Sequence, residues 1–248
     1  STIGLCEELT PKQVILYSRR FGITADMMEN LTTCLGSLST TLQEMISAYG
    51  VFANKGRLVK PLYVLRVEDQ AGNILEYNEP EYKQVTSEET AFLLSNVLQD
   101  VVQRGTGRRA RALGRPSAGK TGTTNESVDA WYIGYIPQLL TGVYVGFDKP
   151  RRMGKSETGS KAAAPIWINF MKNAVANLPT EQFRQPPGIT TVKIHKSGRR
   201  AISCDKDEEI NEEHYKSGTE PVLDLSHFTR CVQAVTEKTK KEESEPEL

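Results

Sequence analysis

The stretch GRPSAGKTGTTN, residues 114–125, contains side chains that could support two different chemistries. Residues 114–121 fit the pattern G-x-x-x-x-G-K-[ST], which is typical of loops that bind nucleotide phosphates. The tetrad KTGT, residues 120–123, fits instead the K-T-G pattern of enzymes that transfer an acyl group through a serine. Each chemistry requires different secondary structure on either side of the motif, so the flanking residues distinguish the two interpretations.

The flanks exclude the nucleotide interpretation. A phosphate-binding loop follows a buried strand and leads into a helix, whose N-terminus and amides surround the phosphates. Here the basic run RRARAL, residues 108–113, comes first, and the poor helix former TGTTNES, residues 121–127, follows. Asp148 could imitate a magnesium ligand, but the chain before it is too short for the helical crossover that parallel strands require.

Hydrophobic spacing and turn residues predict the elements that come before the tetrad. Thr10 precedes Pro11 at the start of a short helix that ends at Gly22. A second helix begins with Ser39 or Thr40 as its cap. Residues 57–78 then predict a hairpin that turns at residues 69–72, and residues 87–105 predict a helix capped by Ser87.

The tetrad itself falls in a run of predicted strands. Residues 118–124, 130–137 and 139–148 are rich in aromatic and β-branched residues and are separated by short turns, which indicates consecutive antiparallel strands. Residues 160–178 predict a helix, and residues 188–202 a further small hairpin. The predicted fold class is therefore α+β, an antiparallel sheet flanked by helices with a small β-containing C-terminal appendage.

Composition and charge define the organisation of the 248 residues. Because 31 Lys and Arg balance 31 Asp and Glu, no net field points to a nucleic-acid partner. We predict a packed body at 1–185, an appendage at 186–235 and a disordered, highly charged tail at 236–248. No window approaches the roughly 18 apolar residues of a membrane span. The chain starts abruptly without Met and is expected to be a piece of a longer protein.

The cysteines and histidines do not indicate a metal site. The four residues Cys204, His214, His227 and Cys231 could be combined, but their spacing matches no standard zinc pattern. We therefore predict neither a metal nor another cofactor. A disulfide between Cys204 and Cys231 is predicted if the protein is exported, because it would brace a segment with few apolar residues.

Several stretches together resemble the transpeptidase domain of class A penicillin-binding proteins, the bifunctional peptidoglycan synthases. They are LGSLSTTLQEMISAYGVFANKGRLVKP (35–61), RGTGRRA with AGKTGTTNESVDAWYIGYIPQLLTGVYVGFD (104–148), PPGITTVKIHKSGRRA (186–201) and YKSGTEP (215–221). They occur in the family's order and cover nearly the whole chain except about the last twenty residues.

The resemblance implies roles for the four residues of the tetrad. Lys120 would supply positive charge and a proton-relay contact, and the hydroxyls of Thr121 and Thr123 would bind the carboxylate of the donor peptide or of penicillin. The Thr123 N–H would form half of the oxyanion hole, a donor typically worth ~3 kcal/mol in the transition state. Gly122 would allow backbone and substrate to approach closely.

Two further motifs of the family have no convincing counterpart in this chain. The nucleophile is a Ser in S-x-x-K at a helix start. The two matches, Ser117 to Lys120 and Ser203 to Lys206, fall on the predicted strand and in the appendage, and S-x-N has no match. We therefore expect the chain to begin just after S-x-N, as the C-terminal portion of a penicillin-binding/β-lactamase-like fold, and to be inert alone.

The intact protein is expected to be a D,D-transpeptidase acylated at its serine by penicillin. Its partners would be peptidoglycan stem peptides and β-lactam antibiotics, together with a glycosyltransferase domain and a membrane anchor in the same chain. It would work at the extracytoplasmic face of the bacterial cytoplasmic membrane. The alternatives are a serine β-lactamase and a non-catalytic binding module of the same fold, which residues upstream of Ser1 would distinguish.

Overall fold

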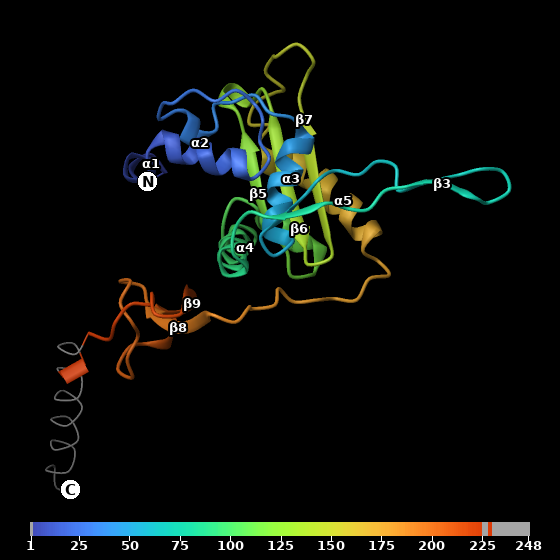
Figure 1. Cartoon of the computed structure of the whole chain (residues 1–248). Coiled ribbons are helices and arrows are strands. Elements are labelled where there is room, and N and C mark those ends of the chain that lie inside the picture. The colour runs from blue at the N-terminus through green and yellow to red at the C-terminus, as the bar shows by residue number, and fades with distance from the viewer. Residues whose placement is uncertain (1, 225–227, 230–248) are drawn as a thin grey trace, which may run out of the picture. The chain divides into compact units, whose positions relative to one another are not determined.

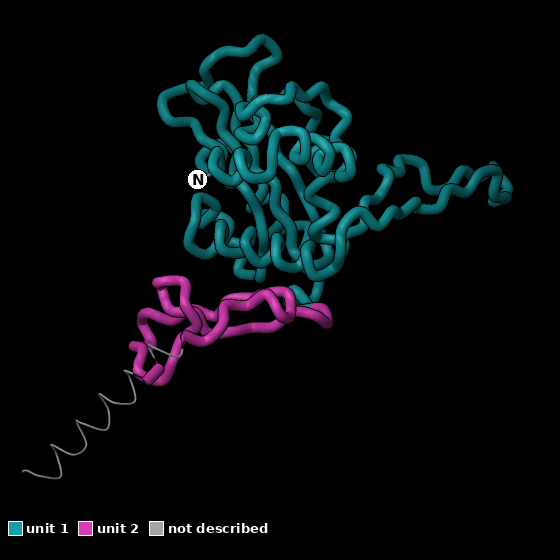
Figure 2. Tube along the Cα trace, turned by 60° about the vertical axis from the view of Figure 1, so that its left-hand side comes forward, with its two compact units in different colours: residues 1–185 teal, residues 186–248 magenta. Residues whose placement is uncertain are grey.

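The computed structural model describes residues 2–224 and 228–229. The chain forms two compact units, Ser1–Gln185 and Pro186–Leu248, which Figure 2 shows in different colours. The tail predicted at 236–248 lies outside the described residues.

The N-terminal segment of the first unit is helical and cross-linked. It contains α1 (Thr2–Leu9), α2 (Pro11–Arg20) and the 3-10 turn η1 (Thr33–Leu35). α2 begins as predicted, because the Thr10 hydroxyl accepts a hydrogen bond from the Gln13 N–H at 3.5 Å. A disulfide joins Cys6 to Cys34 and so ties α1 to η1, a bond that the sequence did not predict.

Helix α3 (Leu42–Ala53) begins one or two residues later than predicted. Its cap is Thr41 and not Ser39 or Thr40, because Thr41 and Glu44 form a reciprocal capping box. The same Glu44 carboxylate accepts a hydrogen bond from the Thr24 N–H at 2.8 Å. The Thr24 hydroxyl, and then the N–H groups of Thr41 and Thr24, hold the pKa of Glu44 well below its usual value.

Two short strand pairs follow α3. β1 (Arg57–Val59) pairs with β4 (Tyr82–Gln84), and between them β2 (Arg66–Glu68) and β3 (Ile74–Tyr77) form an antiparallel hairpin. The predicted turn is confirmed: Asp69 closes it by accepting hydrogen bonds from the Ala71 and Asn73 N–H groups. This hairpin extends away from the rest of the unit in Figure 1.

The centre of the first unit is an antiparallel sheet in the order β5-β6-β7. The predicted strands are confirmed as β5 (Ala118–Thr123), β6 (Ala130–Ile136) and β7 (Leu139–Val145). In Figure 1, α3 and α4 (Glu88–Gln103) lie over one face of the sheet and α5 (Ala164–Ala174) over the other. This arrangement confirms the predicted α+β fold class.

Aromatic side chains join the sheet to α5. The rings of Tyr132 and Trp167 lie 5.1 Å apart, and both side chains are fully buried. The Trp167 indole N–H donates to the carbonyls of Gly134 and Thr141, at 3.2 and 3.1 Å. On the opposite face, the hydroxyls of Ser95 on α4 and Tyr135 on β6 are hydrogen-bonded at 2.8 Å. The sheet is therefore fixed by both helical layers.

Short helical turns connect these elements. They are the 3-10 turns η2 (Arg108–Leu113) after α4 and η3 (Asn125–Ser127) after β5, and the π-helical turn η4 (Gly159–Ala163) before α5.

The second unit is built on one long antiparallel pair, β8 (Ile189–His195) with β9 (Ile210–Lys216), and the 3-10 turn η5 (Asp207–Glu209) precedes β9. The hairpin predicted within 188–202 is present only in short form: an antiparallel bridge joins Ile194 to Arg200, and the Ala201 N–H donates to the Lys193 carbonyl at 2.8 Å. The main partner of β8 is β9 and not this segment. Cys204 is a disulfide cysteine. Cys231, which the sequence suggests as its partner, lies outside the described residues.

The described residues contain neither a membrane-spanning helix nor a metal-ligand cluster. None of their helices is both long and apolar enough to cross a bilayer. They also bring together no group of three His, Cys, Asp or Glu side chains that could hold a metal ion. Of the zinc candidates, His227 and Cys231 lie outside this part of the chain.

Candidate functional site

The KTGT tetrad lies on β5, at an edge of the sheet. β6 pairs with one side of β5, and in the described part of the chain no strand pairs with the other side. The register places Lys120 opposite Ile133 and Thr121 opposite Tyr132. Because Tyr132 packs on α5, Thr121 and Thr123 belong to the α5 face of the sheet, and Lys120 and Gly122 to the α3–α4 face. A ligand along the open edge of β5 can reach side chains of both faces.

Lys120 combines an exposed side chain with a partly desolvated charge. Its ammonium donates a hydrogen bond to the Thr121 carbonyl at 2.8 Å. Desolvation of the ammonium lowers the pKa of Lys120 from its usual value, although the side chain as a whole remains accessible. The site thus holds a cation that a ligand can reach and that is less strongly hydrated than a free surface lysine.

The Thr121 hydroxyl is paired with a residue outside the tetrad. Its Oγ1 lies 2.8 Å from the Oγ1 of Thr106, and either oxygen can be the donor. Thr106 lies in the turn RGTG, residues 104–107, which follows α4. RGTG belongs to the stretches that resemble the family, but nothing in the sequence predicts its contact with the tetrad.

The Thr123 hydroxyl is held by the turn that leads into α5. Its Oγ1 accepts a hydrogen bond from the Gly159 N–H at 3.0 Å. A Cβ on Gly159 would lie 2.3 Å from the Trp131 carbonyl oxygen and 2.5 Å from that of Gly122, so only glycine fits there. A single glycine at residue 159 matches no motif, so the sequence gives no signal for this role.

Gly122 makes room for an aromatic neighbour. A Cβ at Gly122 would lie 3.0 Å from the Cβ of Trp131, whose ring packs on Tyr144 at 4.8 Å. The Tyr144 hydroxyl donates to Asp129 at 2.7 Å, and the Asp129 N–H donates to the Thr124 hydroxyl at 2.8 Å. These contacts fix the turn between β5 and β6 at the end of the tetrad.

Neither S-x-x-K match has the geometry of an activated nucleophile. Ser117 is 1% exposed and directly precedes β5, so its Oγ is shielded from any ligand. Ser203 is exposed, but it lies in a turn of the second unit that the Asp205 carboxylate closes by accepting from the Ile202 N–H at 2.8 Å. Neither serine opens an α-helix.

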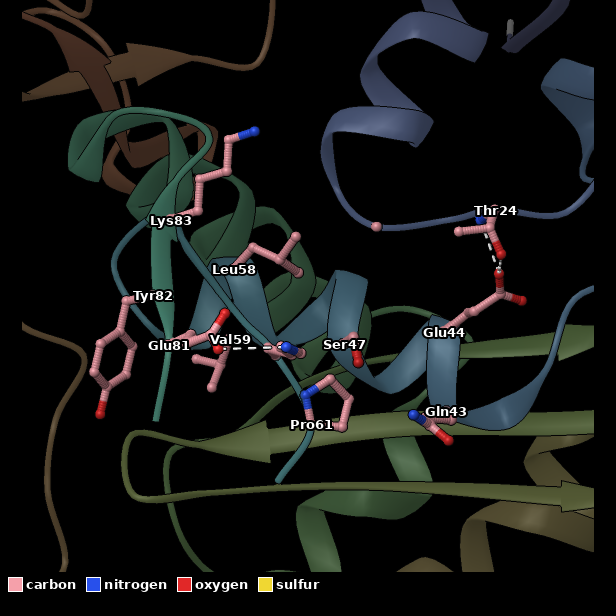
Figure 3. A pocket seen from close by; sticks show the side chains of 12 residues that line it. Thr24, Gln43, Glu44, Ser47, Leu58, Val59, Pro61, Glu81, Tyr82 and Lys83 are labelled. Carbon is pink, nitrogen blue, oxygen red and sulfur yellow. Dashed lines mark hydrogen bonds and ion pairs between the residues drawn. The ribbon is translucent and has the colours of Figure 1, made fainter. Parts of the chain in front are cut away.

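A separate cavity of about 420 Å³ lies between α3, the segment after α2 and the β1–β4 pair (Figure 3). Figure 3 shows Thr24 and Glu44 on one side of it and Leu58 and Lys83 on the other. Its charged groups include Lys60, which pairs with Glu81 at 3.3 Å, and the Glu44 carboxylate that caps α3. None of its lining residues comes from β5, so the tetrad and this cavity are distinct features.

Comparison with known families assigns the fold around the tetrad. The penicillin-binding protein transpeptidase domain matches residues 16–172, which include α3, α4, the three-stranded sheet and most of α5. The chain belongs to the penicillin-binding protein transpeptidase family. The KTGT tetrad lies within the matched residues.

Similar proteins of this family carry the name penicillin-binding protein 1A. The chain is 34% identical to that of Aquifex aeolicus over 226 residues, which are 91% of this chain and 31% of the relative. It is 34% identical to that of Rickettsia conorii over 216 residues, 78% of this chain and 27% of the relative. The chain thus spans about a third or less of the length of these penicillin-binding proteins.

Solved structures of the same family superpose on the chain. The crystal structure of penicillin-binding protein 1A from Haemophilus influenzae matches with a TM-score of 0.82 and 28% identity, over 89% of this chain and 38% of that one. PonA1 from Mycobacterium tuberculosis in complex with penicillin V matches with a TM-score of 0.61 and 26% identity, over 71% of this chain and 53% of that one.

Proposed function

We propose that this chain supplies the substrate-binding strand of a serine D,D-transpeptidase of a class A penicillin-binding protein. The observation that carries the proposal is the position of the tetrad. This chain belongs to the transpeptidase family, and its Lys120, Thr121 and Thr123 lie on a strand with an open edge. Such an edge combines a cation, two hydroxyls and backbone N–H groups, which are the donors that an anionic acyl donor needs.

Each residue of the tetrad has its own role in the proposed reaction. The Thr121 and Thr123 hydroxyls bind the carboxylate of a D-Ala-D-Ala stem peptide or of a β-lactam. Lys120 stabilises negative charge and contacts the proton relay, and its lowered pKa suits both tasks because a less hydrated cation interacts more strongly. The Thr123 N–H serves as one donor of the oxyanion hole.

The nucleophile of the proposed reaction comes from a serine outside this chain. Ser117 is buried, and Ser203 lies in a turn and does not open an α-helix, so neither has the setting of the S-x-x-K serine. In the intact protein, the serine oxygen attacks the carbonyl carbon of the D-Ala-D-Ala bond and the terminal D-Ala leaves. The acyl group then passes to an amine of a neighbouring stem peptide, and the serine is restored.

The proposed setting is the extracytoplasmic face of the bacterial cytoplasmic membrane. A glycosyltransferase domain and a membrane anchor would belong to the same intact protein, as partners of the transpeptidase. Support comes from the relatives named penicillin-binding protein 1A, which are about three times longer than the matched region.

Labelling with a fluorescent penicillin followed by denaturing electrophoresis tests the proposal. We expect no covalent band on the chain of residues 1–248, because the tetrad only stabilises an acyl transition state that a nucleophile must create. We expect a strong band on a longer protein that also includes the upstream S-x-x-K and S-x-N motifs. Unlabelled penicillin should compete the band away.

Two outcomes would contradict the proposal in different ways. A band on residues 1–248 that disappears in Ser117→Ala or Ser203→Ala would identify a nucleophile within this chain. Absence of a band on the longer, folded protein would favour a non-catalytic binding module of the same fold.

A further inference from the structure

Thr106 contacts the tetrad although it lies fourteen residues upstream of it, at the far end of α4. The contact joins the two hydroxyl oxygens, Thr106 Oγ1 and Thr121 Oγ1, at 2.8 Å. Thr106 is exposed and Thr121 half-buried, so the pair lies at the surface beside the open edge of β5. The hydroxyl pair is therefore accessible to a ligand at this edge.

The turn that carries Thr106 is held closely against the end of α4. The Gly105 N–H donates to the carbonyls of Asp100 and Val101, both at 3.1 Å, and the Gly107 N–H donates to the Val101 carbonyl at 3.0 Å. A Cβ on Gly105 would lie 2.8 Å from the Cα of Val101, so a larger residue would push the turn away. The two glycines thus let the chain fold tightly and fix the position of Thr106 between them.

Helix α4 in turn is fixed to the sheet. It packs against β5, and the hydroxyl of its buried Ser95 lies 2.8 Å from that of Tyr135 on β6. The distance between the Thr106 and Thr121 hydroxyls is therefore set by packed backbone and not by a flexible loop. Such support is what holds a binding group in a productive geometry.

The numbers of donors and acceptors on the two hydroxyls determine which one donates to the other once an anion binds. Each hydroxyl has one proton to donate and can accept two hydrogen bonds. A carboxylate can only accept, so Thr121 must turn its proton towards the carboxylate and accept from Thr106. A chain of donors from Thr106 through Thr121 to the carboxylate results, and hydrogen bonds in such a chain strengthen one another.

We propose that Thr106 is a positioning residue for carboxylate recognition: its hydroxyl orients and polarises the Thr121 hydroxyl towards the carboxylate of the acyl donor. The inference rests on the proposed function, because it assigns the carboxylate to the same edge of β5. Thr106 acts on the ligand only indirectly, through Thr121. The effect of removing its hydroxyl must therefore depend on whether the ligand has a carboxylate.

A comparison of acid and ester substrates tests this dependence in the longer protein that carries the serine. The acylation rate constant is measured with penicillin G and with its methyl ester, which lacks the anion, in wild type and Thr106→Val. Valine keeps the shape of the side chain and removes the hydroxyl. We expect the variant to react with the free acid about three- to tenfold more slowly, the effect of one lost hydrogen bond, and with the ester at the wild-type rate.

Two further variants control for structure. Thr106→Ser keeps the hydroxyl and should restore the wild-type preference for the acid. Thr190→Val removes a hydroxyl from a similar pair, because the Oγ1 of Thr190 on β8 lies 2.8 Å from the Oγ of Ser217, which directly follows β9. It should leave both rates unchanged. Equal slowing of acid and ester by Thr106→Val, or no slowing of either, would overturn the proposal.

A binding measurement on residues 1–248 separates this inference from the proposed function. The backbone amide signal of Thr121 is followed by NMR during titration with N-acetyl-D-Ala-D-Ala. We expect a dissociation constant at least about threefold higher in Thr106→Val than in wild type or Thr106→Ser. If the longer protein is never acylated but this difference holds, the proposed reaction fails and the role of Thr106 stands. Equal affinities, or no response of Thr121 in the wild type, would overturn the role of Thr106.

Discussion

At the scale of single residues, the side chains of the tetrad contribute little to the packed core. The side chain of Lys120 is exposed, and its ammonium donates to the carbonyl of the neighbouring Thr121. The structural work at this end of the sheet is done instead by buried glycines and aromatics such as Gly159 and Tyr132. Substitutions of the two groups should therefore have separable effects on activity and stability.

Lys120→Ala should affect activity and leave stability almost unchanged. In the longer protein that carries the serine, we expect acylation by penicillin to slow by about a hundredfold or more, since the variant loses the charge and, with it, the proposed proton-relay contact. Lys172→Ala, which removes an exposed lysine of α5, is the matched control and should react like the wild type. Unchanged acylation together with a lower melting temperature would show that Lys120 is structural.

Gly159→Ala should show the opposite behaviour. The added methyl group would lie 2.3 and 2.5 Å from two backbone carbonyl oxygens, which cannot move without shifting β5 or β6. We expect a loss of about 1–3 kcal/mol in the free energy of unfolding, typical of overpacking, measured by urea denaturation. In Gly154→Ala the methyl group would meet only the flexible side chain of Glu157, at 3.2 Å, and stability should change little. Equal effects of the two variants would contradict this explanation.

The candidate site could be predicted from the sequence only where its residues are neighbours in the chain. Lys120, Thr121 and Thr123 form a short motif, and the pattern around them predicted that they lie on an antiparallel strand. The partners Thr106 and Gly159 were missed because each reaches the tetrad through a tertiary contact. Their placement depends on how α4 and the turn before α5 pack on the sheet, which local spacing does not encode.

At the scale of elements, the start of α3 depends on one carboxylate. Glu44 caps its own helix and also accepts hydrogen bonds from Thr24, so it connects α3 to the segment that follows α2. These bonds lower the pKa of Glu44 from the ordinary 4.5. The stabilisation is therefore complete above that value and is lost as the pH falls towards the lowered folded-state pKa.

Glu44→Gln should weaken the pH dependence of stability in acid. In urea denaturation between about pH 6 and pH 3, we expect the wild type to lose more unfolding free energy than the variant, which cannot release this proton. Glu81→Gln is the control, because Glu81 forms only an exposed ion pair with Lys60 and should keep the wild-type slope. Parallel curves for all three proteins would show that Glu44 does not contribute to acid sensitivity.

The disulfide between Cys6 and Cys34 should stabilise the helical segment before α3. It closes a loop of 28 residues that contains α2. A loop of this length corresponds to about 3–4 kcal/mol of lost entropy in the unfolded chain. We expect the double variant Cys6→Ala/Cys34→Ala to unfold at lower urea than the wild type, measured by circular dichroism. A wild-type midpoint, or failure to recover the Cys6–Cys34 peptide in a non-reducing digest, would contradict the expectation.

Elements with complete local signals were predicted well, and those that depend on distant pairing were not. α4 has Ser87 as its cap and a periodic apolar stripe. β6 and β7 meet at a two-residue turn. All three elements could therefore be predicted from neighbouring residues. β8 instead pairs with β9, across a turn-rich segment that includes η5. The hairpin expected within 188–202 forms only one bridge, between Ile194 and Arg200, whereas β8 and β9 pair over seven residues.

At the scale of the whole molecule, each unit has its own core. The main cluster surrounds Trp167, Tyr132, Ile136 and Met171, all from the first unit. In the described part of the second unit the larger buried apolar side chains are Ile189, Val192, Ile194 and Ile202. A core of that size is marginal without cross-links, so the disulfide of Cys204 should matter more to its unit than any single contact.

The two units should therefore unfold in separate transitions. In differential scanning calorimetry of residues 1–248, we expect one transition from the first unit and a smaller one from the second. Cys204→Ser should lower or abolish the smaller transition, because it removes the cross-link of a small core, and should leave the larger one in place. Removal of residues 186–248 should likewise leave the larger transition at its original temperature. A single transition that shifts as a whole in Cys204→Ser would contradict this expectation. It would mean that the two units unfold cooperatively and that the boundary at Gln185 does not separate independently stable parts.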